Sequence, residues 1–270
     1  MINIQTIDWN QVWKEKKAMR SSPFRGRSSW NKRAPSFGEN SAKSNYAEAF
    51  IQIINPKRSW RIFDMACGTG TLAVPLAKRV KNITAADFSD TMLEALRTRC
   101  EKSSISNIRI MNVSWEDDWT KAGIGVHDIV IASRSLVVDD LRGAILKLDN
   151  FARRRVYIST IVGDGPHDRR VFDAIGRELD AGPDYIYTYN LLYQMGISAN
   201  VYFIVETNRK SYKTPHDAFR SLQWMVGGMN ANEEARLENY LDKHLVYGMG
   251  RWMLNYETTV KWAVIWWEKD

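Results

Sequence analysis

Arg61-Ile-Phe-Asp64-Met-Ala-Cys-Gly68-Thr-Gly70-Thr-Leu72, followed by Ala85-Ala-Asp87-Phe-Ser89, is the most informative part of the chain. The first run has the pattern of a strand, a glycine turn and the start of a helix, and the second run ends another strand with an acid. Glycines let the backbone approach a ligand closely, and the following helix has unpaired N–H groups in its first turn. Asp87 follows the turn by about 20 residues, where a carboxylate accepts ribose hydroxyls in open α/β sheets. These features predict a nucleoside cofactor site.

Two cofactor classes are compatible with the glycine pattern. Gly68-x-Gly70-x-x-Ala73 also satisfies the dinucleotide fingerprint, so a nicotinamide-dependent dehydrogenase is an alternative. Asp64, just before the turn, would repel a pyrophosphate and attract the ammonium and sulfonium of S-adenosylmethionine. The acid therefore favours S-adenosylmethionine.

At these residues the chain resembles the class I S-adenosylmethionine-dependent methyltransferases. Asp64-Met-Ala-Cys-Gly-Thr-Gly70 is similar to their first motif, and Ala86-Asp87-Phe88-Ser89-x-x-Met92-Leu93 is similar to their second. The resemblance covers about residues 45–160, and within the family it points to the small-molecule branch typified by quinone-biosynthesis enzymes. It implies S-adenosylmethionine as cofactor and S-adenosylhomocysteine as product.

Alternating strand and helix patterns predict a doubly wound, Rossmann-like α/β fold with a mostly parallel sheet. The family ends on an antiparallel last strand, which implies that residues 200–208 and 259–267 complete a seven-stranded sheet. Residues 252–256 and 259–267 are expected to form a closing strand pair. The other expected strands are residues 60–65, 82–87, 108–113, 128–133 and 155–160. Helices are expected at residues 8–20, 41–54, 168–179, 185–195, 215–225 and 233–245, with the first helix of the glycine-turn unit starting near Thr71.

Two segments are expected along the chain. Residues 1–55 form an N-terminal helical, basic segment that covers the cofactor site, and residues 56–270 form the methyltransferase domain, with substrate-side insertions at about 165–198 and 212–250. The formal net charge is +7, and lysines and arginines are interleaved with aromatic residues in the first 33 positions. Such a mixture binds RNA through phosphate contacts and stacking, or is a solvated arm whose rings pack on the domain. RNA is therefore a possible partner.

Composition argues against several other classes. No apolar run approaches the ~20 residues of a membrane span, and the N-terminus lacks a basic-then-apolar signal pattern, so we expect a cytoplasmic protein without a membrane span. The cysteines Cys67 and Cys100 cannot build a disulfide framework, and neither has a neighbour at metal-ligand spacing. No metal site is expected.

Loops at the carboxyl ends of the strands should line the cofactor pocket. The glycine turn would hold the methionine part, Asp64 would act through its charge or a bridging water, and Asp87 would bind the ribose. Asp64 as a turn cap and Asp87 as a helix N-cap are the structural alternatives. By resemblance, residues 114–115 would border the adenine and residues 132–134 would face the sulfonium. The expected cofactor-binding residues are Asp64, Ala66, Cys67, Gly68, Thr69, Gly70, Asp87, Phe88, Ser89, Met92, Ser114, Trp115, Ser133 and Arg134.

Arg134 has three open roles: binding an anionic substrate, binding the cofactor carboxylate, or pairing with Asp139 or Asp140. His167, after the fifth strand, is the candidate general base, with a surface loop position as its alternative. Residues 30–37 resemble the segment that closes over the cofactor in quinone-type enzymes, and the tyrosines of residues 185–195 either wall an apolar acceptor or form their own core. The substrate-side candidates are Trp30, Arg33, Phe37, Tyr189 and Tyr193.

The sequence therefore predicts a methyltransferase that moves a methyl group by in-line displacement to a small molecule, aromatic or anionic in character. Such a reaction requires mainly proximity and alignment, and it needs a general base only if the acceptor must lose a proton. An RNA methyltransferase is the alternative within enzymes. Since no catalytic base is evident, a regulatory protein that binds S-adenosylmethionine without turnover is the alternative of another class.

Overall fold

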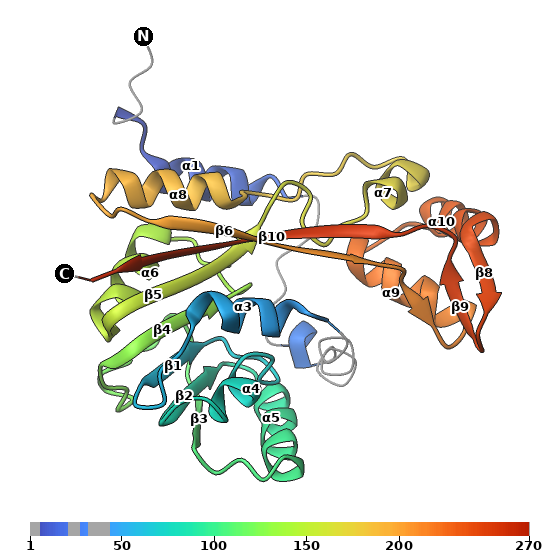
Figure 1. Cartoon of the computed structure of the whole chain (residues 1–270). Coiled ribbons are helices and arrows are strands. Elements are labelled where there is room, and N and C mark those ends of the chain that lie inside the picture. The colour runs from blue at the N-terminus through green and yellow to red at the C-terminus, as the bar shows by residue number, and fades with distance from the viewer. Residues whose placement is uncertain (1–5, 21–27, 32–43, 270) are drawn as a thin grey trace.

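A seven-stranded sheet forms the centre of the computed structural model, which describes residues 6–20, 28–31 and 44–269 (Figure 1). The strand order is β3-β2-β1-β4-β5-β10-β6. β1 to β5 run parallel to one another, whereas β10 runs antiparallel to both β5 and β6. The predicted sheet with an antiparallel last strand is confirmed. Its strands are β1 (Arg61–Met65), β2 (Asn82–Asp87), β3 (Ile108–Asn112), β4 (His127–Ser133), β5 (Ala152–Ile161), β6 (Asn200–Asn208) and β10 (Thr258–Glu268).

Helices cover both faces of this sheet. Side chains alternate between the two faces along each central strand, and both sets are apolar, so each face must be buried. Ile62 of β1 packs in a core with α3, α4 and α5, and the next residue, Phe63, packs in a second core with α1, α6 and α8. Both side chains are fully buried. The helices of the two layers are α1 (Trp9–Ala18), α3 (Tyr46–Ile54), α4 (Ala73–Ala77), α5 (Asp90–Lys102), α6 (Leu141–Phe151) and α8 (Tyr185–Gln194).

The connection from β3 to β4 has no helix, and a tryptophan fills the space instead. Trp119 is buried, its ring lies 5.0 Å from the Phe63 ring and 5.3 Å from the Phe151 ring, and its Nε1–H donates to the Ser114 carbonyl at 2.9 Å. The segment leads into His127, whose Nδ1 lies 2.7 Å from the Gly125 carbonyl and whose Nε2 lies 2.9 Å from the Thr84 hydroxyl. Burial lowers the pKa of His127, so this histidine is a neutral structural residue.

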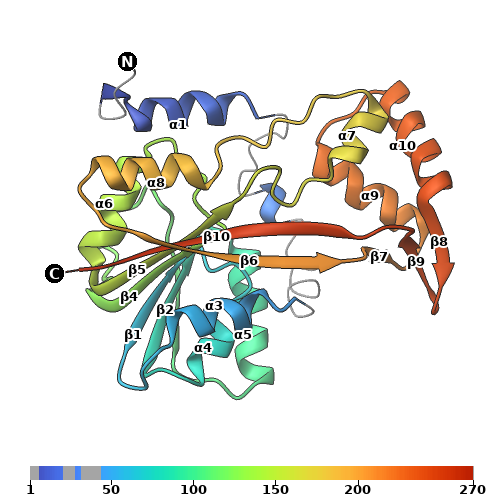
Figure 2. The same cartoon turned by 45° about the horizontal axis from the view of Figure 1, so that its top comes forward.

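A small lobe lies beyond the carboxyl ends of β5 and β6 (Figure 2). It consists of α7 (Arg169–Ile175), α9 (Pro215–Val226), α10 (Ala231–His244) and a three-stranded sheet of order β7-β9-β8, and it has its own apolar core. β7 is Ser211–Tyr212, β8 is Leu245–Gly248 and β9 is Arg251–Leu254. Because the carboxyl ends of the parallel strands point toward this lobe, the loops expected to bind cofactor face it.

The prediction that residues 252–256 pair with residues 259–267 is wrong. β9 pairs with β7 and β8 in the small lobe, whereas β10 belongs to the main sheet. A tight hairpin joins β8 to β9 through Met249 and Gly250, whose φ angles are 52° and 75°. Two positive φ angles are the signature of the hairpin turn that matches strand twist, and methionine is a rare residue there.

Within the described ranges, none of the helices is long and apolar enough to cross a membrane.

Candidate cofactor site

Asp87 ties the glycine turn to the end of the neighbouring strand. Its Oδ2 accepts the Gly68 backbone N–H and its Oδ1 accepts the Ser89 backbone N–H, each at 2.9 Å. Cys67 N–H donates to the Ala86 carbonyl at 3.0 Å, which joins the same two loops through the backbone. These contacts fix the Asp87 carboxylate at the carboxyl end of β2, beside the glycine turn. Helix α5 is capped by Ser89, so the N-cap role is not filled by Asp87.

The two glycines of the turn have different roles. Gly68 is partly exposed with φ 55°, and Ala66 before it also has φ 55°, so the exposed tip of the turn lies in left-handed backbone. Gly70 is buried, and a Cβ on it would lie 2.4 Å from Leu96 Cδ1 of α5. Gly70 therefore allows close packing of α5, whereas Gly68 lies at the exposed tip of the turn.

Thr69 lies between the glycines and is fully buried. Its carbonyl accepts a hydrogen bond from Arg99 Nη1 at 2.7 Å. Burial lowers the pKa of that guanidinium. The hydrogen bond from Arg99 to the Thr69 carbonyl thus holds the turn against α5.

Asp64 is a buried acid beside the turn, with an exposed fraction of 2%. Burial first, and then the negative charge of Asp87, raise its pKa from 3.8 to about 8. Without a cation nearby, Asp64 is therefore mostly protonated at neutral pH. An approaching ammonium or sulfonium would lower the pKa of Asp64 and favour its ionised form, and the carboxylate would in turn attract the cation.

Cys67 is buried in the same turn. Burial raises the pKa of its thiol, and the nearby carboxyl groups of Asp64 and Asp87 raise it further when they are ionised. The thiol stays protonated and is a small packing residue there, because only a thiolate is an effective nucleophile.

The loop after β2 brings the expected adenine-side residues together. Ser89 Oγ accepts the Met92 backbone N–H at 3.2 Å, Met92 is buried, and Phe88 is partly exposed. Ser89 Oγ also donates to Asn31 Oδ1 at 2.6 Å. This hydrogen bond places the short helical segment 28–31 beside the candidate cofactor site.

Segment 28–31 also reaches the small lobe. The Trp30 ring lies 6.1 Å from the Trp224 ring of α9, with an interplanar angle of 72°. Segment 28–31 therefore lies between the cofactor-binding loops and the lobe. Two further substrate-side candidates, Arg33 and Phe37, lie outside the described residues.

The loop after β3 is ordered by its own polar contacts. Ser114 N–H donates to Asp117 Oδ2 at 2.8 Å, and the Trp115 carbonyl accepts from Lys147 Nζ at 2.7 Å. The Trp115 ring packs on the Trp119 ring at 5.6 Å. Trp115 is thereby held on the α6 side of the sheet, and Ser114 marks where this loop leaves β3.

The ends of β4 and β5 carry a cluster of hydroxyl groups. Tyr46 of α3 is fully buried, and its hydroxyl lies 2.8 Å from Ser133 Oγ and 2.5 Å from Ser159 Oγ. Burial raises the pKa of Tyr46. The sequence pattern assigned Tyr46 to the apolar face of a helix, and nothing in that pattern signals the partners of its hydroxyl.

Arg134 follows this cluster in left-handed backbone, with φ 56°. Its backbone N–H donates to both the carbonyl and the Oγ of Ser159, each at 3.0 Å. Its guanidinium carbon lies 4.1 Å from the centre of the Tyr46 ring and 5.4 Å from that of the Trp262 ring.

The two acids that the sequence offered to Arg134 have other partners. Asp139 accepts from Lys17 Nζ at 2.7 Å. Asp140 caps α6 and accepts from Asn10 Nδ2 at 3.0 Å. The Arg134 guanidinium therefore lies over aromatic rings and pairs with neither acid.

The remaining candidates lie in the loop after β5 and on α8. The His167 ring contacts the Phe172 ring of α7 at 5.9 Å and borders a cavity formed with Lys210 and residues 258–260. Tyr189 packs in the core that contains α1 and α6, and Tyr193 is 59% exposed on α8. In both views α8 lies beside α1 (Figures 1 and 2).

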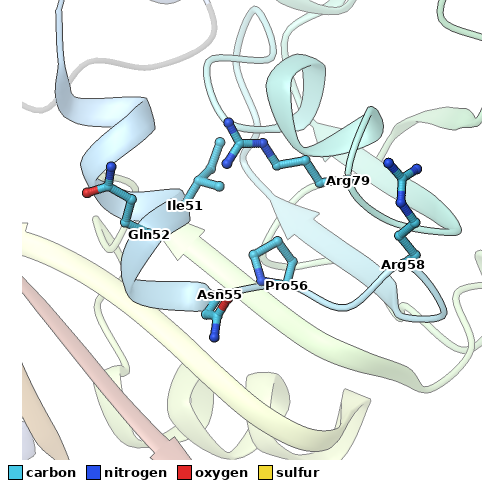
Figure 3. Close-up of a pocket in the computed structure, with 6 residues that line it drawn as sticks. All are labelled: Ile51, Gln52, Asn55, Pro56, Arg58 and Arg79. Atoms are coloured by element: carbon cyan, nitrogen blue, oxygen red, sulfur yellow. The ribbon is translucent and has the colours of Figure 1, made fainter.

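A separate cavity opens between α3, α4 and the loop that precedes β1 (Figure 3). Its lining residues are Ile51, Gln52, Asn55, Pro56, Arg58 and Arg79. It lies at the amino end of β1, whereas ligands of open α/β sheets bind at the carboxyl ends. It is therefore distinct from the candidate cofactor site.

Known proteins resemble this chain in sequence and fold. A family model described as a methyltransferase domain matches residues 62–152. An uncharacterised protein of Haemophilus influenzae is 34% identical over 248 residues, covering 89% of each chain. The ubiquinone/menaquinone biosynthesis C-methyltransferase of Zymomonas mobilis is 36% identical over 77 residues, which are 28% of this chain and 30% of that protein.

A solved structure with the same fold is the precorrin-6y C5,15-methyltransferase of Geobacter metallireducens, with a TM-score of 0.50 and 10% identity over 83% of this chain and 87% of that chain. The matched domain includes the acid, the glycine turn and Asp87. A methyltransferase domain of this kind uses S-adenosylmethionine as its cofactor. The chain contains a class I S-adenosylmethionine-dependent methyltransferase domain.

Proposed function

We propose that this protein transfers the methyl group of S-adenosylmethionine to a small-molecule acceptor. The observation that carries the proposal is the pair of buried acids around the glycine turn. Asp87 is held by two backbone N–H groups in a position to bind a ribose, and Asp64 is a buried acid whose ionisation a nearby cation would favour. A cationic nucleoside satisfies both requirements at once.

The cofactor would lie across the carboxyl ends of β1 and β2. Residues 66–68 would contact the methionine part, Asp64 would face its ammonium, and Asp87 would accept the ribose hydroxyls. Phe88 and Met92 would pack on the adenine. The bound cofactor supplies an activated methyl group: the acceptor's electron pair forms the new bond to carbon, and the carbon–sulfur pair stays on sulfur to give S-adenosylhomocysteine.

The protein's part in such a displacement is alignment of the acceptor and exclusion of water. The buried Cys67 thiol is protonated, so a covalent enzyme intermediate is not part of this proposal. The raised pKa of Tyr46 likewise disfavours its phenol as a base. We assign the hydroxyl cluster of Tyr46, Ser133 and Ser159 a positioning role at the end of β4.

The N-terminal contacts favour a small acceptor over RNA. In α1, Lys16 pairs with Asp180 at 2.5 Å and Lys17 pairs with Asp139 at 2.7 Å. Trp13 is buried and its Nε1–H donates to the Val138 carbonyl at 2.9 Å. These two cations and this ring are engaged by the protein itself, whereas RNA binding requires cations and rings turned outward.

The small lobe and segment 28–31 would enclose the acceptor. We propose residues 1–55 as a cover for the cofactor site and residues 56–270 as the methyltransferase domain, with substrate-side insertions at about 165–198 and 212–250. The Ser89–Asn31 and Trp30–Trp224 contacts support this division, because they join the cofactor-binding loops, the cover and an insertion.

Transfer of labelled methyl from S-adenosylmethionine into a host-cell extract tests the proposal. The extract is divided into small-molecule, RNA and protein fractions, and each is incubated with wild-type protein and with Asp87→Ala. We expect label in the small-molecule fraction with wild type and little with the variant. Label in the RNA fraction alone would instead establish an RNA methyltransferase.

A binder without turnover gives a different result. It would bind S-adenosylhomocysteine in a calorimeter and transfer label to none of the three fractions. That outcome would reject the enzymatic function while leaving the cofactor site intact.

A further inference from the structure

Arg134 directly follows β4, and its guanidinium has no anionic partner among the described residues. No salt bridge or side-chain hydrogen bond of Arg134 occurs in that part of the chain, and its side chain is partly exposed. Glu206 is close enough to Tyr46 to raise the pKa of its phenol, and its carboxylate accepts from Trp262 Nε1 at 3.0 Å and from Ser44 Oγ. The carboxylate that faces the cluster is thus already bound by two donors.

Aromatic rings hold this guanidinium in place. The Tyr46 and Trp262 rings lie 4.1 and 5.4 Å from its central carbon, distances at which a cation is attracted to a ring face. The two rings lie at 70° to each other, so the guanidinium is not flat against both, and its five N–H donors can still bind an acceptor. An arginine fixed in this way is prepared to bind an oxyanion through two parallel hydrogen bonds.

The backbone at Arg134 supports the same conclusion. A non-glycine residue in left-handed backbone costs free energy and persists only where the surroundings hold it. Both hydrogen bonds from the Arg134 N–H to Ser159 hold this conformation, and Ser159 is itself bonded to Tyr46. The orientation of Arg134 is therefore specified by residues of α3, β5 and β10.

The sheet order separates this cation from the cofactor half of the site. The cofactor residues Asp64 and Asp87 lie on β1 and β2, whereas the rings under Arg134 belong to α3 and to β10 on the far side of β4 and β5. The guanidinium is directed to the rings of that second half. A group bound by the Arg134 guanidinium would therefore belong to a second molecule that lies next to the cofactor, not to the cofactor itself.

We propose that Arg134 binds an oxyanion, a carboxylate or a phosphate, on the methyl acceptor. This assignment rests on the proposed function and specifies its substrate class: the acceptor is an anionic small molecule. Arg134 is then a specificity-determining residue, and Tyr46, Ser159 and Trp262 position it.

The test uses the full-length protein and the small-molecule extract separated by anion exchange at pH 7 into retained and unretained pools. Methyl transfer to each pool is measured at limiting acceptor for wild type, Arg134→Met and Arg134→Lys. Binding of S-adenosylhomocysteine is measured in parallel by calorimetry. Phosphatase treatment of the retained pool separates the two sources, because it removes an acceptor phosphate and spares a carboxylate.

Arg155→Met is the matched control. Arg155 also lies over two rings, 5.9 Å from Trp60 and 5.3 Å from Trp266, but it pairs with Glu268 at the amino end of β5. Its substitution removes a stacked cation of the same kind away from the site. Thermal melting of both methionine variants shows that each is folded, and Arg134→Lys serves if Arg134→Met is not.

We expect the retained pool to carry the label. Arg134→Met should lower transfer roughly tenfold to hundredfold, as loss of a charge-assisted hydrogen-bonded pair predicts. Arg134→Lys should be intermediate because it keeps the charge and loses the two-pronged geometry. Arg155→Met and the affinity of all variants for S-adenosylhomocysteine should change less than about twofold.

Three results would overturn the assignment. Equal transfer by wild type and Arg134→Met, or label in the unretained pool, would remove Arg134 from acceptor recognition and leave the methyltransferase function standing. A parallel loss of S-adenosylhomocysteine affinity would assign Arg134 to the cofactor carboxylate. Absence of transfer to either pool by a wild-type protein that binds S-adenosylhomocysteine would reject the proposed function and this assignment together.

Discussion

Replacing Asp64 by asparagine should remove a pH dependence from cofactor binding. Because the pKa of Asp64 is about 8 in the protein without cofactor, about one tenth of the molecules carry the ionised acid at pH 7. Ionising it there costs about 1.4 kcal/mol, and about 2.7 kcal/mol at pH 6. If the cofactor's ammonium binds the ionised acid, wild-type affinity should fall about tenfold for each pH unit below 8, and Asp64→Asn should lack this slope.

Calorimetric titration with S-adenosylhomocysteine between pH 6 and 8 measures the effect without turnover. The ligand's own α-amino group titrates in the same way with both proteins, so the difference between the two pH profiles isolates Asp64. Titration in buffers of different ionisation enthalpy should show close to one additional proton released by wild type at pH 7. Parallel pH profiles for wild type and Asp64→Asn would refute the reasoning.

The same acid predicts the pH dependence of stability. A pKa raised in the folded state means that the Asp64 contribution is fully present below about pH 3.8 and is lost as pH rises toward 8. The cofactor-free wild type should therefore lose up to about 1.4 kcal/mol per pH unit relative to Asp64→Asn across that window. Urea unfolding of both proteins at pH 5 and 8 measures the change, and a constant difference between them would contradict it.

Three further substitutions test the site and its support. Asp87→Ala should weaken S-adenosylhomocysteine binding at least about tenfold in calorimetry and should also destabilise the protein, because the Gly68 N–H loses its acceptor; unchanged affinity would remove Asp87 from the site. Gly70→Ala should destabilise the protein by about 1–3 kcal/mol in urea unfolding, since its φ is 79° and its Cβ would lie 2.4 Å from Leu96, and the second substitution Leu96→Ala should relieve only the steric part. The double variant should lose less unfolding free energy than the sum of the two single variants, and a loss equal to that sum would count against the packing role. Trp13→Ala should cost about 3–5 kcal/mol while leaving RNA affinity in a filter-binding assay unchanged; a large loss of RNA binding with little loss of stability would support the RNA alternative.

The main sheet could be predicted because the central strands are short buried runs between turn signals. β2 has the predicted bounds, and β1 and β4 differ from the prediction by one residue at their starts. Buried parallel strands leave this mark in any sequence, since both of their faces must be apolar. The acid–glycine–acid spacing then located the loops that form the candidate site.

The helix bounds were less predictable. The helix expected over residues 168–179 ends at Ile175, because Gly176 adopts left-handed backbone with φ 80° and closes the last turn. The helix expected from near Thr71 spans only Ala73–Ala77. The described part of the helix expected at residues 41–54 begins at Tyr46, and residues 41–43 lie outside the described ranges.

The small lobe and the polar partners at the end of β4 could not be predicted from local patterns. Residues 245–254 form a hairpin around Met249, a residue type that carries no signal for positive φ. Likewise, the contact of Arg134 with Tyr46 and Trp262 joins positions far apart in the chain, and side-chain periodicity records burial rather than partners. These features depend on tertiary packing.

A crystal structure of the protein with S-adenosylhomocysteine tests the central claim most directly. The account predicts ribose oxygens within hydrogen-bond distance of Asp87, the amino group beside Asp64 and the methionine part against residues 66–68. Density for the ligand in the cavity lined by Ile51 and Arg79, or a ribose that does not contact Asp87, would contradict it.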